Sequence, residues 1–444
     1  MKKILTAIAI ILMLSMMTTL LFGCNSDDTP TDTNENTSGT TATEGTQGTT
    51  ATTQGTTATS ATTTQTTKKE DEPFIWSESD LISEALYFEY EDHTAMVKRL
   101  GRTQQLSTGL AVDMVASGIE FKGAFVGDVT LDLKCTAVRD NEAYLAVFID
   151  GVRVSDIYFG SKRETGKFHV TAAEGVKTLT IASFDEPGEH TIRIVKQTES
   201  GYALLDFIKL AYTGMLDNPP EENDLYIEFI GDSLTCAMGS AGDTSISGGG
   251  SAQGTKGADW EDGTFGYAYR TADMLDADYS IVSESGIGLA HTWFTSKMGN
   301  FYTRSSYNRS TTDMYEFERT PDLVVINLGT NDHFLKTTSG HSQHYTDANI
   351  VQKEAKALME TIRQNYGPDV KILWVSGVWS GIEYEENQVN AAIAELGGEA
   401  AGIYSMKLTY HEENKKGAEG HPSKTGHDGI MSQVYAYILN KELA

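Results

Sequence analysis

Short apolar runs alternate with helix-like segments throughout the C-terminal half of the chain, and this alternation constrains the fold more than any other feature. Four runs have the length and composition of buried strands: 225–230, 279–282, 323–328 and 371–375. Apolar residues recur at helical spacing from Ile350 to Tyr366, and the segment from Gly426 to Leu443 is predicted to be a closing helix. Buried strands that alternate with helices are typical of a parallel sheet. Residues 225–444 are therefore predicted to form a three-layer α/β domain, with a parallel sheet between layers of helices.

Three of the four predicted strands end in glycine beside serine, asparagine or aspartate. These ends read Gly231-Asp232-Ser233-Leu234, Ser283-Glu-Ser-Gly286-Ile-Gly288 and Gly329-Thr330-Asn331-Asp332. In open α/β sheets the ligand crevice lies off the carboxyl ends of the strands. We therefore expect the polar chemistry of the domain at this edge of the sheet.

Ser233 and His421 are candidates for a nucleophile and its base. A serine hydroxyl attacks poorly without a general base, and a lone serine after a strand is more often a helix cap. His421, in Gly420-His421-Pro422-Ser423, precedes the closing helix, and an imidazole has the pKa of a general base near neutral pH. Gly286 is a candidate oxyanion donor through its backbone N–H, and Asn331 is one through its side-chain amide. Either residue alone is equally typical of an ordinary turn.

The four features together resemble the SGNH (GDSL) hydrolase superfamily: Gly-Asp-Ser-Leu after the first strand, glycine after the second, Gly-x-Asn-Asp after the third and a late His-Pro. The similarity covers residues 225–444. It implies that Ser233 is the nucleophile, that His421 is the base, and that Gly286, Asn331 and the Ser233 amide form the oxyanion hole. No Gly-x-Ser-x-Gly motif occurs in the sequence, which argues against an ordinary α/β-hydrolase.

One position departs from the pattern of the superfamily. The superfamily usually places aspartate three residues before the catalytic histidine, where this chain has Ala418. The imidazole would then be oriented by Glu419, by a backbone carbonyl or by water, and a neutral acceptor stabilises an imidazolium less than a carboxylate does. The site is therefore predicted to be a Ser–His dyad or an atypical triad. His427 is the second candidate for the base, and His333 is expected near the rim of the site.

Residues 74–213 have the pattern of an all-β domain. Apolar and polar residues alternate in six predicted strands: 128–135, 144–149, 152–154, 176–184, 190–195 and 204–212. Asp150-Gly151 is a hairpin signal, and Asp185-Glu-Pro-Gly188 is predicted to separate two strands. Short strands with turn signals indicate a sandwich or jelly roll, and residues 217–224 are predicted to link it to the α/β domain. We expect the β-domain to brace its neighbour and to shape the rim of a cleft; binding sugar by itself is the alternative.

A β-sandwich of this size directly before an SGNH domain resembles carbohydrate esterase family 2. The segment from Arg270 to Tyr279, followed by Ser285-Gly286-Ile287-Gly288, is similar to the middle region of that family. The resemblance implies an acetylxylan esterase or a related polysaccharide deacetylase, and some members lack the triad acid, in agreement with Ala418. We therefore expect a serine esterase that removes O-acetyl groups from plant cell-wall polysaccharide, xylan or a mannan, with no metal or organic cofactor.

Three tryptophans are candidates for stacking on sugar rings because they lie in predicted loops near strand ends: Trp260, Trp293 and Trp379. Trp374 lies inside a predicted strand and is expected in the core. His341-x-x-His344 has the spacing of a partial metal site, but further ligands are missing, so no catalytic metal is predicted. Cys135 and Cys236 are expected to be small core residues, and a disulfide between them stays open if the protein lies outside the cytoplasm.

The N-terminal segment has the pattern of a targeting sequence followed by a flexible linker, which acts as a tether. Lys2 and Lys3 precede an apolar run, and Leu21-Phe22-Gly23-Cys24 resembles the lipobox of bacterial lipoproteins. The resemblance implies a signal peptide over residues 1–24 and a lipid on Cys24, which would anchor the protein at the extracellular face of the cell membrane. An ordinary secretory signal or a retained helix are the alternatives. Residues 25–72 contain no Ile, Leu, Val, Met, Phe, Tyr or Trp, so 25–73 is predicted to be a disordered, threonine-rich linker.

The net charge of the chain limits the classes of molecule that it is expected to bind. The net charge of −28 argues against nucleic acid, which needs clustered lysine and arginine, and against polyanionic substrates. The expected partners are an acetylated polysaccharide as substrate and the membrane through the lipid anchor, with the protein as a monomer. Two other functions stay open. One is an SGNH esterase that acts on lipid or on esters of the bacterial wall. The other is a non-catalytic carbohydrate-binding surface lipoprotein, which is considered because Ala418 replaces the usual triad acid.

Overall fold

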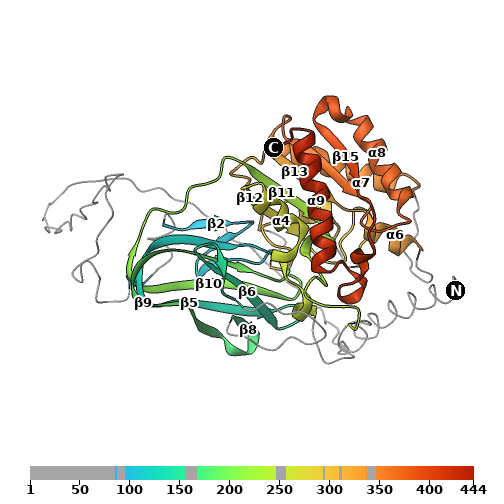
Figure 1. Ribbon diagram of the computed structural model, residues 1–444. Helices are drawn as coiled ribbons and strands as arrows, with labels where there is room; N and C mark the ends of the chain where they lie inside the picture. The colour runs from blue at the N-terminus through green and yellow to red at the C-terminus, as the bar shows by residue number, and fades with distance from the viewer. Residues whose placement is uncertain are drawn as a thin grey trace, which may run out of the picture.

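The computed structural model describes residues 86–87, 96–155, 168–246, 257–293, 296–309, 313–337 and 347–444. They form two domains that pack side by side, an antiparallel β-domain coloured blue to green and an α/β domain coloured yellow to red (Figure 1). The predicted signal peptide, Cys24 and the threonine-rich linker lie outside these residues, as do His341 and His344. None of the described helices is both long enough and apolar enough to cross a membrane.

Ten strands among the described residues form one connected antiparallel sheet. Three long strands make its centre: β10 (Ala203–Leu216), β5 (Gly118–Ala137) and β9 (Val176–Lys196). The other seven flank or extend them: β1 (Leu86–Tyr87), β2 (Lys98–Leu100), β3 (Gln104–Leu106), β4 (Gly109–Ala111), β6 (Glu142–Ile149), β7 (Val152–Arg153) and β8 (His169–Thr171). Their buried side chains, among them Phe121, Leu131 and Ile194, form a single core. The β-rich N-terminal domain is therefore confirmed, and its jelly-roll arrangement stays a prediction.

The two predicted turns of the β-domain had different outcomes. Asp150 and Gly151 both have positive φ angles, 52° and 77°, and join β6 to β7 as a hairpin, as predicted. The segment Asp185-Glu-Pro-Gly188 was expected to separate two strands, and this was wrong, because β9 runs through it as one strand. The neighbouring strand β5 pairs with β9 on both sides of the segment, and a register shift between Phe125 and Gly127 absorbs the extra residues as a bulge.

Five strands form the parallel sheet of the second domain, in the order β12-β11-β13-β14-β15. Four of them match the predicted strands: β11 (Tyr226–Gly231), β12 (Asp278–Ser283), β13 (Leu323–Asn327) and β14 (Lys371–Ser376). The parallel sheet is therefore confirmed. The edge strand β15 (Ile403–Lys407) was not predicted, because Ile403 is its one buried residue.

Helices cover both faces of the parallel sheet. The described helices of this domain are α3 (Ser233–Cys236), α4 (Tyr267–Met274), α5 (Met298–Phe301), α6 (Thr330–Thr337), α7 (Ile350–Tyr366), α8 (Glu383–Glu395) and α9 (Lys424–Asn440). Alternate residues of β11 face opposite sides, as the period of a strand requires. Ile227 and Phe229 pack in one cluster with α4 and α9, whereas Ile230 packs in another with α5, α7 and α8. In Figure 1, α4 and α9 lie together in front of the sheet.

The two domains share a buried interface. Val115 of the β-domain belongs to the same apolar cluster as Phe229 of the parallel sheet. An ion pair also crosses the interface, with the Arg102 guanidinium 3.0 Å from the Glu228 carboxylate and neither side chain exposed. Separating a buried ion pair is costly, so we expect the domains to move as one body, although the predicted linker 217–224 contains neither helix nor strand.

Candidate active site

Ser233 lies directly off the carboxyl end of β11, as the first residue of α3. Gly231 allows the chain to turn there, because a Cβ at this position would lie 1.9 Å from the Thr235 Oγ1. Asp232 caps the helix, and its carboxylate accepts a hydrogen bond from the Leu234 amide at 3.0 Å. The tight strand-to-helix turn therefore holds the serine hydroxyl at the edge of the sheet, with 7% of the residue exposed.

His421 lies in the loop before α9 and meets Ser233 directly. Its Nε2 is 2.9 Å from the Ser233 Oγ, and its Nδ1 is 3.2 Å from the backbone carbonyl oxygen of Glu419. When Nδ1 carries the proton and donates to that carbonyl, Nε2 is left to accept the serine proton. Glu419 has the left-handed backbone conformation, φ 56° and ψ 23°, and the contact with the imidazole comes from its main-chain oxygen. Of the predicted ways to orient His421, the structure thus shows a backbone carbonyl.

Ala418 stands where an aspartate would complete a triad, and its surroundings are apolar. It is fully buried in a cluster with Ile246 and Trp260. A Cβ added at Gly242 would lie 2.5 Å from the Ala418 Cβ, so the cluster has no spare room. A carboxylate at this position would be buried in that cluster, and burying a charge is unfavourable unless it is paired.

The electrostatics of the site favour a neutral base. Burial lowers the pKa of His421 to about 4, while the Glu419 carbonyl and the negative charge of Glu199 act to raise it. The imidazole is therefore unprotonated at neutral pH and able to accept a proton. His427, the second candidate for the base, is buried on α9, where it accepts a hydrogen bond from the Tyr267 amide at 3.3 Å. Burial lowers its pKa to about 3, and the structure places His421 rather than His427 against the serine.

Asn331 connects the residues predicted to form the oxyanion hole. Its Nδ2 donates to the Ile287 carbonyl at 2.8 Å and to the Asp232 carboxylate at 3.2 Å. Since Ile287 follows Gly286 and Asp232 precedes Ser233, one carboxamide links the two turns that carry the backbone donors. Within the described residues, the Ser233 and Gly286 amides donate no hydrogen bond, so both are available to a substrate oxygen. Both Nδ2 protons are in use, so Asn331 would bond an oxyanion by sharing one of them.

Asp332 fixes the loop that follows Gly286, and this role was not predicted. Its buried carboxylate accepts hydrogen bonds from three successive amides, those of Leu289, Ala290 and His291, at 2.8, 2.7 and 2.8 Å. The Gly-x-Asn-Asp motif was the available signal, because Asp332 follows Asn331 and faces the same crevice.

Two of the three predicted tryptophans line the site. The Trp379 ring lies 5.5 Å from the imidazole of the candidate base and 5.0 Å from the Phe334 ring, which was not predicted. Trp293 donates from Nε1 to the Asn331 Oδ1 at 3.1 Å, and both tryptophans are half-buried. The prediction for Trp260 was wrong: it is 2% exposed and belongs to the apolar cluster of Ala418, so no sugar can stack on it.

The remaining candidate residues make contacts that are structural and not catalytic. Cys135 and Cys236 are both buried free thiols, so the open alternative of a disulfide between them was wrong. Burial raises the pKa of the Cys236 thiol well above its usual range, which disfavours the nucleophilic thiolate. His333 is half-buried, with its Nδ1 3.0 Å from the Glu385 carboxylate. In the part of the chain that the structure describes, no three His, Cys, Asp or Glu side chains are grouped to hold a metal.

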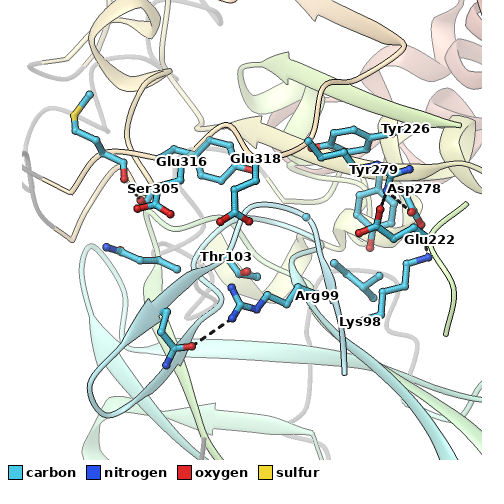
Figure 2. A pocket seen from close by; sticks show the side chains of 17 residues that line it. Lys98, Arg99, Thr103, Glu222, Tyr226, Asp278, Tyr279, Ser305, Glu316 and Glu318 are labelled. Carbon is cyan, nitrogen blue, oxygen red and sulfur yellow. Dashed lines mark hydrogen bonds and ion pairs between the residues drawn. The ribbon is translucent and has the colours of Figure 1, made fainter. Parts of the chain in front are cut away.

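A polar pocket of about 300 Å³ lies at the opposite end of the parallel strands (Figure 2). Its lining includes Tyr226 and Asp278, the first residues of β11 and β12, and Lys98 of the β-domain. Ser233 lies two residues beyond Gly231, the last residue of β11, so a strand of six residues, roughly 20 Å at 3.3 Å per residue, separates the pocket from the Ser–His pair. Lys98 is paired with Asp278 at 2.5 Å, and this pocket is distinct from the candidate active site.

Sequence families match both domains. Residues 229–428 match the GDSL-like Lipase/Acylhydrolase family, and residues 100–220 match the family described as Carbohydrate esterase 2 N-terminal. The C-terminal domain is therefore a GDSL-like hydrolase domain, with its Ser–His pair at the carboxyl edge of the sheet.

Two curated proteins and one solved structure are similar to this chain over more than half of its length. The cellulase/esterase CelE of Acetivibrio thermocellus is 27% identical over 272 residues, which is 60% of this chain and 31% of the relative, so the chain spans about a third of that protein. The acetylxylan esterase / glucomannan deacetylase of Cellvibrio japonicus is 22% identical over 267 residues, 58% of this chain and 69% of the relative. The solved acetyl xylan esterase from the rumen bacterium Butyrivibrio proteoclasticus shares the fold, with a TM-score of 0.65 and 20% identity over 81% of this chain and 99% of that chain. The predicted pair of domains is thus confirmed: a domain of the Carbohydrate esterase 2 N-terminal family precedes a GDSL-like hydrolase domain.

Proposed function

We propose that the protein is a serine esterase that removes O-acetyl groups from plant cell-wall polysaccharide, acetylated xylan or an acetylated mannan. The observation that carries the proposal is the 2.9 Å contact between the Ser233 Oγ and the His421 Nε2. A hydroxyl with a neutral base within hydrogen-bond reach meets the geometric requirement for an activated nucleophile. The amides of Ser233 and Gly286, beside that hydroxyl, are the donors that an acyl-transfer site needs.

The proposed reaction has two halves. Ser233 Oγ attacks the acetyl carbonyl carbon while His421 Nε2 takes the hydroxyl proton. The amides of Ser233 and Gly286, with Asn331, hold the carbonyl oxygen as it becomes negative; a single such donor is worth about 3 kcal/mol in the barrier. Collapse breaks the bond between the acetyl carbon and the sugar oxygen, and His421 gives the proton to that departing oxygen, which leaves as a hydroxyl. Water, deprotonated by His421, then releases acetate and restores the serine.

Orientation of His421 by a carbonyl affects how well the imidazolium is stabilised during the attack. The imidazolium that forms during attack is stabilised at Nδ1 by the neutral Glu419 carbonyl, which contributes less than a carboxylate would. Because His421 is a weak base with a pKa of about 4, the developing oxyanion has to supply the counter-charge. In a site of low dielectric, opposite charges at this range attract strongly, so catalysis is expected to depend on the oxyanion donors more than on a third side chain.

A sugar substrate is supported by the side chains around the dyad and by the relatives. Trp379, Phe334 and Trp293 are half-buried beside the Ser–His pair, and aromatic faces offer large apolar area for packing on a sugar ring. One curated relative is an acetylxylan esterase / glucomannan deacetylase. The net charge of −28 also favours a neutral polymer over a polyanionic one.

We further propose that the mature chain begins at Cys24, carries lipid there, and is tethered through residues 25–73 to the outer face of the cell membrane as a monomer. The support is the Leu-Phe-Gly-Cys sequence after an apolar run and the absence of Ile, Leu, Val, Met and aromatic residues from the tether. Metabolic labelling with an alkyne fatty acid tests the anchor. Label on the parent and none on Cys24→Ser supports it, and equal label on both overturns it.

Acetate release from acetylated xylan and acetylated glucomannan tests the function, with the protein lacking residues 1–24 compared with its Ser233→Ala variant. Release by the parent alone supports the proposal, and the ratio between the polymers sets the substrate. Ser233-dependent cleavage of 4-nitrophenyl acetate without release from either polymer would keep the esterase and remove the polysaccharide, leaving lipid or wall esters. Polysaccharide binding without Ser233-dependent turnover of any ester would make the protein a carbohydrate-binding surface protein instead.

A further inference from the structure

Glu199 of the β-domain is buried at the domain interface, and its carboxylate touches both turns that carry the oxyanion donors. It lies between β9 and β10 with no exposed side-chain surface. Its Oε2 accepts a hydrogen bond from the Ser285 amide at 2.5 Å and another from the Cys236 thiol at 3.1 Å. Ser285 immediately precedes Gly286, and Cys236 is the last residue of the short helix that Ser233 begins. One side chain from the β-domain therefore connects the two sides of the oxyanion hole.

Further contacts from both domains hold the same glutamate. Its Oε1 forms an ion pair with Arg139, which also donates to the Glu284 carboxylate at 3.1 Å. Its main-chain carbonyl accepts a hydrogen bond from the buried Lys196 ammonium at 2.8 Å, and its amide donates to the Glu261 carboxylate at 2.5 Å. With both its main chain and its side chain bonded, Glu199 has little freedom to follow a displacement of the loops it contacts.

Three glutamates, Glu199, Glu261 and Glu284, lie close together around this contact. Burial, with the negative charge of Glu199 as the next cause, raises the pKa of Glu284 to about 8 and that of Glu261 well above its usual range. Glu199 forms an ion pair with Arg139. A hydrogen bond to a charge-paired acceptor is stronger than one between neutral groups, so the bond from the Ser285 amide to Glu199 is a strong contact between the domains.

We propose that Glu199 is a positioning residue for the esterase reaction, which fixes the Gly286 amide relative to the Ser233 amide so that the β-domain completes the oxyanion hole. The inference rests on the proposed function, because it assigns a residue to that same site. Oxyanion donors act only when they lie close to hydrogen-bond distance from the developing charge, and a displacement of about 1 Å costs up to a hundredfold in rate. The β-domain is then part of the active site, without contacting the substrate at this point.

The kinetic test compares Glu199→Gln with a matched control, Asp206→Asn. Asp206 pairs with Arg309 across the same interface and contacts neither Ser285 nor Cys236. With 4-nitrophenyl acetate, Glu199→Gln is expected to lower kcat at least tenfold and to change KM by less than about twofold, because the small ester loses transition-state contacts and keeps its ground-state ones. Asp206→Asn is expected to keep the parent kcat. Equal losses in both variants, or a loss confined to KM, would overturn the inference.

Amide hydrogen exchange provides a second readout that needs no turnover. Glu199→Ala removes the acceptor of the Ser285 amide, so the peptide that covers residues 283–288 is expected to exchange at least tenfold faster, with the parallel strands unchanged. Unchanged exchange of that peptide would overturn the inference. If the parent shows no Ser233-dependent turnover, the proposed function fails. The amide hydrogen exchange of residues 283–288 then decides by itself whether Glu199 positions this loop. If Glu199→Ala exchanges fast everywhere, its fold is lost, and the kcat of Glu199→Gln decides.

Discussion

Replacing Ala418 by aspartate, the residue that usually orients the histidine in this superfamily, is expected to weaken the protein without improving catalysis. Ala418 is fully buried among Ile246 and Trp260. Gly242 packs closely against it, because a Cβ added at Gly242 would lie 2.5 Å from the Ala418 Cβ. The Nδ1 of His421 is occupied by the Glu419 carbonyl at 3.2 Å. We therefore expect an aspartate at 418 to lie among the side chains of this cluster, with the imidazole Nδ1 still bonded to the Glu419 carbonyl.

Two costs add in this variant. The extra atoms in a filled cluster cost about 1–3 kcal/mol. A buried carboxyl without a partner has a raised pKa, and a rise from about 4 to about 7 costs about 4 kcal/mol at pH 7, at about 1.4 kcal/mol per unit. Ala418→Asn has nearly the same shape without the charge, so the difference between the two variants isolates the charge.

The sign of the pH dependence follows from the direction of the shift. A carboxyl whose folded-state pKa is raised costs nothing below the pKa of the unfolded chain, and it destabilises increasingly as the pH rises towards the folded-state pKa. Ala418→Asp and Ala418→Asn are therefore expected to be equally stable near pH 4. Above that, the aspartate variant is expected to lose about 1.4 kcal/mol per pH unit relative to the asparagine variant until its carboxyl ionises.

Urea denaturation between pH 4 and pH 8 measures this difference, and kcat/KM for 4-nitrophenyl acetate over the same range reports the base. We expect kcat/KM of Ala418→Asp to stay at or below that of the parent. An aspartate that reached the His421 Nδ1 would act in the opposite way. It would ionise, stabilise the protein relative to Ala418→Asn as the pH rises, raise the pKa of His421 and increase kcat. That result would refute the conclusion that the loop is built around a carbonyl.

Three further predictions follow from the site and the interface. Because burial lowers the pKa of His421 to about 4, kcat/KM is expected to keep its plateau as the pH falls to about 4, and an acid limb near 6.5, the ordinary imidazole value, would contradict this. Trp379→Ala is expected to raise KM for acetylated polysaccharide about fivefold, from a loss of about 1 kcal/mol of ring contact, and to leave kcat/KM for 4-nitrophenyl acetate within about twofold; equal losses on the two substrates would remove Trp379 from the sugar site. Glu228→Ala leaves Arg102 buried without its partner and is expected to cost about 3–5 kcal/mol, with both domains unfolding in a single calorimetric transition; two separate transitions would show that the domains are independent.

The α/β domain could be predicted from sequence because fully buried strands have a local signal. Every residue of β11, β12 and β13 is buried, and each strand contains a short cluster of apolar residues that can be recognised in the sequence. The edge strand β15 has one buried residue, Ile403, and therefore no such cluster. The turn predicted at 185–188 failed for the opposite reason: its proline and glycine are a strong local turn signal, but pairing with β5 on both sides of it overrides that preference.

The candidate site could be predicted only as far as side-chain types identify it. Ser233 and His421 came from the motifs, because nucleophile and base need those side chains. A backbone carbonyl was one of the predicted ways to orient His421, but which carbonyl it is could not be predicted, since every residue has one and only the backbone conformation brings that of Glu419 to the imidazole. Glu199 was missed because it belongs to the other domain, where nothing near it in sequence signals a catalytic loop. Trp260 looked like a loop tryptophan, and tertiary packing with Ile246 buries it.

Trapping the acyl-enzyme tests the central claim, that Ser233 and His421 form the esterase dyad, most directly. Protein quenched within milliseconds of mixing with 4-nitrophenyl acetate would be digested, and its peptides weighed by mass spectrometry. The account predicts one acetyl group on Ser233 of the parent, none at that position in Ser233→Ala, and acetylation at least a hundredfold slower in His421→Ala, the usual contribution of a general base. Acetylation of another residue with turnover kept in Ser233→Ala, or an undiminished rate in His421→Ala, would contradict it.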